Sequence, residues 1–269
     1  MADRDAAFVG SIPQNYDRYL GPLLFQHYAD DLAARLPVKD GMHVLETACG
    51  TGILTERLAR RLGTRGTLVA TDLNEPMLRH AQGKKIGGAI EWRQADATAL
   101  PFDDGSFDAV VSQFGLMFYP DKARGVREAW RVLRPGGRYL FNVWDAIARN
   151  PVTRITHETV ASFFPVDPPQ FYTVPFSLSD PEPVRAWLTA AGFTNVEPTA
   201  VEHVGVSPSA AEAAIGLIDG NPIATAISER RPEILEEVKA AVARNVATEL
   251  GDRPVRTPLR AWVYAATRR

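Results

Sequence analysis

The chain has 269 residues, of which 45% are hydrophobic and 23% charged, and a formal net charge of −2. These values are those of an ordinary globular protein, and the near-neutral charge gives no support for nucleic-acid binding, for which a basic surface is usual. The single cysteine excludes an intramolecular disulfide, and neither a secretory leader at residues 1–7 nor an apolar run of roughly 20 residues is visible, so a cytoplasmic protein without a membrane span is expected.

An amphipathic helix from Pro22 to Leu36 is the first predicted element, because apolar residues recur there every three or four positions before Pro37. A regular alternation of strand and helix signals follows. The predicted strands cover 42–47, 66–71, 89–94, 107–112 and 138–144, and the predicted helices cover 53–62, 75–82 and 123–133. Repeated β–α units of this length predict a parallel sheet with helices on both faces.

The pattern changes after Trp144. A helix is predicted around 151–163, then a proline-rich stretch, a helix over 181–191, and strands over 194–206 and 258–266. Between these last two strands, about 207–252 has helical composition and is too long for a simple loop, so a cap beside the site is expected. The seven strands together predict an α/β fold, a doubly wound, Rossmann-like and mostly parallel sheet with helical cap insertions.

A glycine-rich turn joins the first predicted strand to its helix, in the segment Val44-Leu-Glu-Thr-Ala-Cys-Gly-Thr-Gly52. Strand, glycine turn and helix together present backbone N–H groups and a helix N-terminus to a ligand. An acid, Asp72, ends the second strand twenty positions after Gly52. In nucleotide-binding α/β folds such a carboxylate accepts hydrogen bonds from ribose hydroxyls. The two features therefore predict a ligand that contains adenosine.

The choice between a dinucleotide and S-adenosylmethionine (SAM) depends on the residues around that turn. The dinucleotide fingerprint needs a third small residue, where this chain has Thr55, counted from Gly50, or Ile53, counted from Ala48. An acid inside the strand, Glu46, would repel a pyrophosphate but suits a ligand that carries an ammonium and a sulfonium. Charge complementarity therefore favours SAM over NAD.

Five motifs in this order and spacing resemble those of class I SAM-dependent methyltransferases, in the branch of ubiquinone/menaquinone-biosynthesis and small-molecule methyltransferases. They cover about residues 40–145 and consist of Glu46–Gly52, Asp72–Asn74 with Met77, Gln94–Ala97, Phe107–Phe114 and Leu133–Gly137. One departure is Ala48, which replaces the commoner first glycine and is expected to have an ordinary backbone conformation.

The resemblance implies a role for each matching position. Glu46 would orient the methionine amino group, and the backbone around Ala48, Gly50 and Gly52 would meet the amino-acid portion. The adenosine would be held by Asp72 at the ribose, Leu73 and Met77 against the sugar or adenine, and Asp96 with Ala97 at the adenine. Gln113 and Phe114 would face the sulfonium, and Tyr16 and Tyr19 would come from an N-terminal segment folded over the donor.

The resemblance also implies the organisation of the chain. We expect one domain over 1–269, with an N-terminal helical segment at 1–40, a SAM-binding core at 41–145, and acceptor-side insertions at about 145–180 and 207–252. The product would be S-adenosylhomocysteine (SAH), and the acceptor a small, partly apolar molecule with an O, N or C nucleophile.

No catalytic residue is indicated strongly. His157 lies in a segment that often lines the acceptor site and is the one candidate base, although an ordinary exposed histidine is the favoured interpretation. The five histidines show no metal-ligand spacing, so no metal site is predicted. Catalysis by proximity and orientation is therefore expected. An NAD-dependent oxidoreductase and a non-catalytic SAM-binding partner protein are the alternatives.

Overall fold

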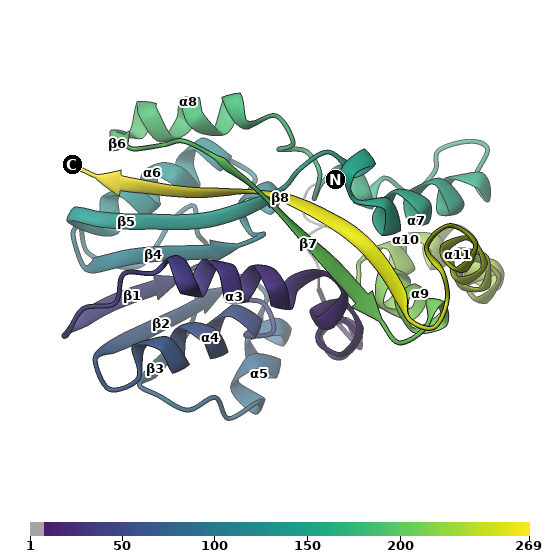
Figure 1. Ribbon diagram of the computed structural model, residues 1–269, viewed down its shortest axis with the longest axis horizontal. Coiled ribbons are helices and arrows are strands. Elements are labelled where there is room, and N and C mark those ends of the chain that lie inside the picture. Colours follow the sequence, from purple (N-terminus) through teal and green to yellow (C-terminus); the bar gives the residue numbers. More distant parts are fainter. Residues whose placement is uncertain (1–7) are drawn as a thin grey trace.

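The computed structural model describes residues 8–269, so the start of the chain used above against a secretory leader lies outside the described residues. An eight-stranded sheet has the order β3-β2-β1-β4-β5-β8-β6, and β7 also pairs with β8 (Figure 1). The strands are β1 (Met42–Glu46), β2 (Gly66–Asp72), β3 (Ile90–Gln94), β4 (Phe107–Gln113), β5 (Leu133–Trp144), β6 (Phe193–Thr194), β7 (Thr199–Ser207) and β8 (Val255–Arg268). Strands β1 to β5 pair in parallel, and β8 pairs antiparallel with β5, β6 and β7, which confirms the Rossmann-like, mostly parallel prediction.

Helices cover both faces of this sheet. The longer ones in the sheet layers are α3 (Gln26–Arg35), α4 (Ile53–Leu62), α5 (Glu75–Gly83), α6 (Lys122–Val132) and α8 (Pro181–Ala191). α3 packs against α4, and α6 against α8 on the opposite face (Figure 1). The central strands β1 and β4 are therefore buried on both sides, as their continuous apolar runs predict.

The sheet has eight strands rather than the seven predicted, because the segment predicted as one strand over 194–206 is divided. Asn195 adopts a φ of 56°, and Pro198 follows before β7 begins. A left-handed residue turns the chain out of the extended conformation, and proline cannot donate to a ladder. Both β6 and β7 nevertheless pair with β8, so they form one interrupted edge of the sheet.

The N-terminal segment differs from the single α-helix predicted over Pro22–Leu36. A short helix, α2 (Ile12–Asn15), leads into a π-helix, η1 (Tyr16–Phe25), which continues into α3. Pro22 lies inside η1, where an α-helix would place its ring against a carbonyl four residues earlier. The wider turn avoids that contact, and the N–H of Gln26 donates to the carbonyl of Gly21, five residues back.

Four helices gather beyond the carboxyl ends of the parallel strands, at the right of Figure 1. They are α7 (Pro151–Ser162), α9 (Ala210–Asp219), α10 (Ile223–Arg230) and α11 (Leu235–Leu250). α11 packs against both α7 and α9, and α9 packs against η1. The predicted helical insertion is thus present, and we call these four helices the cap. No helix within 8–269 has the length and apolarity to cross a membrane.

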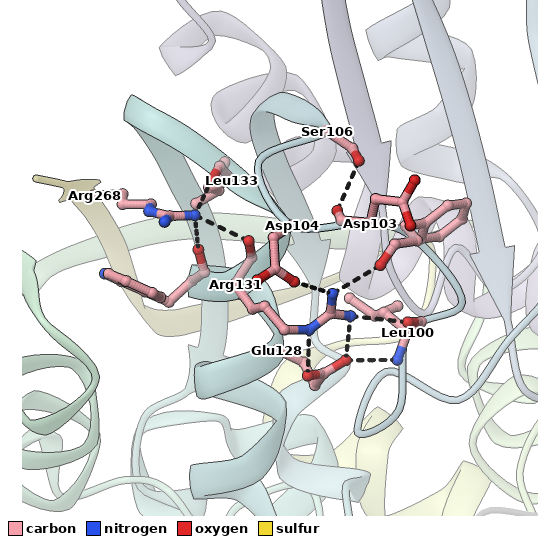
Figure 2. Close-up of polar contacts among 10 residues, drawn as sticks. Leu100, Asp103, Asp104, Ser106, Glu128, Arg131, Leu133 and Arg268 are labelled. Atoms are coloured by element: carbon pink, nitrogen blue, oxygen red, sulfur yellow. Dashed lines mark hydrogen bonds and ion pairs between the residues drawn. The ribbon is translucent and has the colours of Figure 1, made fainter.

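Arg131 on α6 fixes the loop that leads from β3 to β4 (Figure 2). Its guanidinium donates to the carbonyls of Leu100 and Phe102 at 2.9 and 2.8 Å, and to the carboxylates of Glu128 and Asp104. Glu128 also accepts the N–H of Leu100 at 2.8 Å. These charge-assisted hydrogen bonds engage both N–H and carbonyl groups of the loop backbone. The residues between the end of β3 and Leu100 therefore have a fixed position.

Candidate functional site

The turn after β1 is built from left-handed residues. Gly50 has a φ of 56° and Gly52 a φ of 80°, and Gly52 leads directly into α4. Ala48 also has a positive φ, 53°, so the expectation of an ordinary backbone there is wrong. The turn requires this conformation, which costs a non-glycine residue roughly 1–2 kcal/mol. Ala48 packs closely against Gly115, since a Cβ added to Gly115 would lie 2.6 Å from the Cβ of Ala48.

Asp72, at the end of β2, ties this turn to the next one. Its Oδ2 accepts the N–H of Gly50 at 2.8 Å, and its Oδ1 accepts the N–H of Asn74 at 2.7 Å. The side chain is buried, and burial raises the pKa of Asp72 although the backbone hydrogen bonds oppose that rise. A carboxylate has about four lone-pair sites, so Asp72 can still accept bonds from a ligand.

Glu46, at the end of β1, is a buried carboxyl group with an unused acceptor. Its side chain is only 1% exposed, and Oε2 has no hydrogen-bond partner among the described residues. Burial raises the pKa of Glu46 to about 8. It lines a recess of about 280 Å³ together with Tyr16 and Gln113. The Oε1 of Gln113 is also buried without a partner, so two free oxygen acceptors belong to this recess.

A larger cavity of about 740 Å³ adjoins the recess and shares Tyr16, Ala48, Gly50 and Gln113 with it. Of the thirteen positions that the resemblance implies for the donor, the cavity brings together ten, namely Tyr16, Ala48, Gly50, Asp72, Leu73, Met77, Asp96, Ala97, Gln113 and Phe114. Glu46 lines the recess but not the cavity.

Three of the predicted site residues lie elsewhere. Gly52 forms the start of α4, where a Cβ would come within 3.0 Å of the Cβ of Ala81. Tyr19 lies on η1 with its ring under the guanidinium of Arg18. His157 lies on α7 with its ring 6.4 Å from that of Tyr172, and it does not line the cavity.

The lining also contains residues that the sequence did not assign to the donor. They are Phe8, Asn74, Ala95, Gly115, Phe118, Tyr119 and Pro120. Asn74 lies within a matched motif, and Phe118 and Tyr119 follow the matched segment that ends at Phe114. Phe8 precedes the first element and belongs to no periodic pattern, so no sequence signal could have identified it.

Asp96 follows β3 and lines the cavity. Its Oδ1 accepts both the N–H and the hydroxyl of Thr98, at 2.7 and 2.8 Å. Its Oδ2 makes no hydrogen bond within 8–269 and the side chain is half-buried. The cavity lining therefore includes two carboxylates, Asp72 and Asp96.

Aromatic rings form the remaining wall. Phe114 has a φ of 50° at the end of β4, where its N–H donates to the Oδ1 of Asn142 at 2.9 Å. Its ring stacks on Trp144 with centroids 4.0 Å apart. Phe8 and Phe118 meet edge to face at 5.9 Å. Positive φ at a bulky residue is strained and is often found at functional sites.

Residues 8–25, which we call the strap, close the cavity from outside. Asp17 on the strap accepts a hydrogen bond from the hydroxyl of Thr51 at 2.9 Å and a bond from the ammonium of Lys84. His80 Nε2 lies 3.4 Å from the same carboxylate. The strap is thereby held to the turn after β1 and to α5, with Tyr16 directed to the cavity.

The cap packs against the strap through α9 and η1. Among residues 8–269, the cavity-lining residues lie between Phe8 and Pro120, so the insertions predicted on the acceptor side contribute none. Instead α9 supports η1, because a Cβ on Gly216 would lie 2.7 Å from the Cβ of Tyr19. The amide of Asn15 also donates to the carbonyl of Asp219 at 3.4 Å.

Known proteins have sequences similar to that of this chain. A family model described as a methyltransferase domain matches residues 45–141. The ubiquinone/menaquinone biosynthesis C-methyltransferase UbiE of Cronobacter sakazakii is 35% identical over 178 residues, which are 59% of this chain and 69% of that protein. UbiE of Idiomarina loihiensis is 42% identical over 122 residues, which are 44% of this chain and 47% of that protein. The second match thus spans about half of the relative's length.

Solved structures show the same fold. The YcgJ protein of Bacillus subtilis matches 90% of this chain and 99% of its own length, with a TM-score of 0.59 and 18% identity. A phosphoethanolamine N-methyltransferase of Haemonchus contortus, solved with SAH, matches 95% of this chain and 56% of its own length, with a TM-score of 0.61 and 18% identity. Fold, motifs and sequence relatives agree: the chain belongs to the class I SAM-dependent methyltransferases, in the branch that includes UbiE.

Proposed function

We propose that this protein transfers the methyl group of SAM to a small, partly apolar acceptor, and that the cavity and its recess bind the donor. The observation that carries the proposal is the free Oε2 of Glu46. A buried carboxyl without a cation or donor is costly, and an ammonium group from the ligand would satisfy it. The free Oε1 of Gln113 in the same recess supports this assignment.

The other polar groups that line the cavity would serve the rest of the donor. Asp72 would accept bonds from the ribose hydroxyls while it keeps the N–H groups of Gly50 and Asn74. Asp96 would accept the adenine amino group with its free oxygen. Leu73 lines the cavity and is 55% exposed, and bound ligand would shield its side chain from water. Bound SAM supplies an electrophilic methyl group on a sulfonium.

The acceptor would lie at the aromatic wall. Phe114 follows directly after Gln113, and Phe118 faces Phe8. These rings exclude water and bury flat apolar surface, and alignment of the acceptor with the methyl group would supply much of the rate. We further propose a cytoplasmic enzyme without a nucleic-acid substrate, from the near-neutral charge and the single cysteine.

Two measurements test the proposal. Titration calorimetry with SAM and with NAD should give SAM binding in the micromolar range or tighter and no heat with NAD; the reverse would make the protein an oxidoreductase. Incubation with SAM and a panel of phenols, amines and enols should then release SAH. Binding without SAH from any acceptor would favour a non-catalytic SAM-binding protein.

A further inference from the structure

Asn142 on β5 lies behind the cavity wall and contacts the residue that follows β4. Its side chain is fully buried, and it lines neither the cavity nor the recess. In the parallel register of β4 and β5, Asn142 is paired with Gln113, the last pair of that ladder. Its Oδ1 accepts the N–H of Phe114 at 2.9 Å. A side chain of one strand thus supplies the acceptor for the backbone of its neighbour where their ladder ends.

Phe114 needs that acceptor because its backbone has left the strand conformation. Its φ of 50° is a left-handed value that strains a bulky residue. The residue is also buried, and a buried N–H without an acceptor destabilises the conformation that contains it. The ring of Phe114 stacks on Trp144, which lies two residues after Asn142 and therefore projects from the same face of β5. β5 thus fixes both the backbone and the ring of Phe114.

The position of Phe114 determines the position of residues that line the site. Gln113 precedes it directly and lines the recess with Glu46, and the Oε1 of Gln113 has no hydrogen-bond partner among residues 8–269. The ring of Phe114 lies 5.7 Å from that of Phe25, on which Tyr16 stacks at 4.7 Å. A change in the backbone at Phe114 would therefore turn the Gln113 amide and shift the aromatic contacts of Tyr16.

On the basis of the function proposed above, we propose that Asn142 is a positioning residue for the methionine end of the donor. It holds Phe114 in the left-handed conformation, and that conformation directs the amide of Gln113 into the recess beside Glu46. Because Asn142 lines neither space, it acts through these neighbours and not by contact with the ligand. The adenosine would be held by the acids that end β2 and follow β3, whose hydrogen bonds involve neither Asn142 nor Phe114.

Two ligands separate this role from a general loss of binding. SAM would occupy both ends of the site, whereas 5′-methylthioadenosine has the adenosine and the sulfur but lacks the amino-acid portion. Asn142→Leu keeps the branched shape of the side chain and removes the acceptor. Calorimetry should show SAM binding weakened about tenfold or more and 5′-methylthioadenosine binding weakened less than about threefold, since one buried hydrogen bond is lost at the methionine end alone. Wild-type SAM affinity, or an equal loss for both ligands, would overturn the proposal.

A second variant is available if Asn142→Leu does not fold. Asn142→Val is smaller, lacks the acceptor and suits a buried strand. It should show the same selective loss of SAM affinity, and a variant that binds SAM as the wild type does would equally refute the role of Asn142.

Asn142→Asp tests the acceptor oxygen itself. The Nδ2 of Asn142 has no partner among residues 8–269, so this exchange keeps the oxygen that Phe114 uses and loses no hydrogen bond. Burial favours the neutral form of the new carboxyl group. SAM affinity should therefore lie within about threefold of the wild type. An affinity as low as that of Asn142→Leu would mean that the acceptor oxygen does not set the geometry.

Thr156→Val is the matched control for stability. Thr156 is buried on α7, and its hydroxyl donates to the carbonyl of Val152 at 2.8 Å. The exchange removes one buried hydrogen bond at a residue outside the cavity lining. A thermal melt compares its stability with that of Asn142→Leu, and its affinities for both ligands should equal those of the wild type. A selective loss of SAM affinity in this control would contradict the assignment to Asn142.

The wild-type protein separates this inference from the proposed function. If it binds neither SAM nor 5′-methylthioadenosine, the donor site is wrong and both proposals fail. If it binds SAM but the Asn142 variants lose both ligands alike, the donor site stands and only the positioning role is wrong.

Discussion

The strand core over 42–144 and the region over 145–254 differ in what they contribute to the site. The core ends its strands in short polar turns that supply almost the whole cavity lining. The later region buries apolar residues such as Leu217, Val238 and Val242 among its own helices. It supplies no lining residue. We therefore expect the motif-bearing loops to carry the chemistry and the cap to stabilise the strap that covers them.

This difference explains why the two regions should respond differently to mutation. A change in the core turns removes a polar group or a backbone conformation that the ligand meets directly. A change in the cap alters packing and reaches the ligand only through η1, at contacts such as Gly216 with Tyr19. Effects on SAM binding should therefore fall steeply from the core to the strap and from the strap to the cap.

The largest effect is expected at the turn after β1 and at the end of β2. Asp72→Ala removes the proposed ribose acceptor and leaves the N–H groups of Gly50 and Asn74 unpaired, at about 1–3 kcal/mol for each buried group. Gly50→Val places a β-branched residue at a φ of 56°. Each should weaken SAM binding by about 100-fold or more in a protein that remains folded.

Calorimetry measures the affinity, and circular dichroism checks the fold. Asp40→Ala is a matched control, because Asp40 is an exposed acid in the turn before β1, at the other end of this strand from the glycine-rich turn. Wild-type affinity in either site variant, or an equal loss in the control, would contradict the donor-site assignment.

The next effect is a pH dependence that Glu46 imposes on SAM affinity. The pKa of Glu46 is raised to about 8, so the ligand-free carboxyl is protonated at pH 6 and must lose its proton to pair with an ammonium. SAM affinity should therefore rise by up to about tenfold per pH unit below pH 8 and then level off. The same proton should appear as a buffer-dependent heat in calorimetry.

Glu46→Gln provides the comparison. The amide cannot ionise, so its affinity should be lower at pH 8 and nearly constant between pH 6 and 7.5. A wild-type slope that persists in Glu46→Gln would show that another group takes part in the linkage, and the assignment of Glu46 to the ammonium would fail.

An intermediate effect is expected at the strap. Asp17→Ala removes the bonds to Thr51 and Lys84 that hold the strap over the cavity. Because the pair is partly exposed and screened, we expect SAM dissociation to be roughly tenfold faster, with a smaller change in the association rate. Stopped-flow fluorescence of a competing ligand measures both rates. Asp30→Ala is the control, since Asp30 pairs with Arg57 outside the cavity; equal rates in the two variants would mean that the strap does not retain SAM.

The sequence predicted the parts of the site that depend on local order. Asp72 follows a buried strand and the glycines follow another, and the carboxyl ends of neighbouring parallel strands meet at one edge. The resemblance implied the ten cavity residues, and apart from Tyr16 and Met77 they lie at the ends of strands or in the turns that follow them. The fold class followed from the same alternation of strands and helices.

The remaining features depend on contacts between distant segments. Phe8 reaches the cavity because the N–H of Phe8 donates to Asn74, 66 residues away, and no periodicity could indicate that contact. The π-helix around Pro22 packs against α9 and β7. Its wider turn therefore depends on contacts with distant segments as well as on local propensity. The sequence also could not predict where the cap lies relative to the cavity. A helix that lines a pocket and a helix that packs against another helix have similar apolar patterns.

The smallest effect is expected in the cap, at the one histidine that the sequence singled out. His157 is half-buried on α7 beside Tyr172, outside the cavity. His157→Ala should change kcat by less than about twofold and leave its pH profile unchanged, while the loss of about 1 kcal/mol of packing lowers the melting temperature by roughly 2–4 °C. Initial rates across pH 6–9 and a thermal melt measure both. A tenfold loss of kcat, or a profile that loses one limb, would place the base in the cap and remove the division of roles between the two regions.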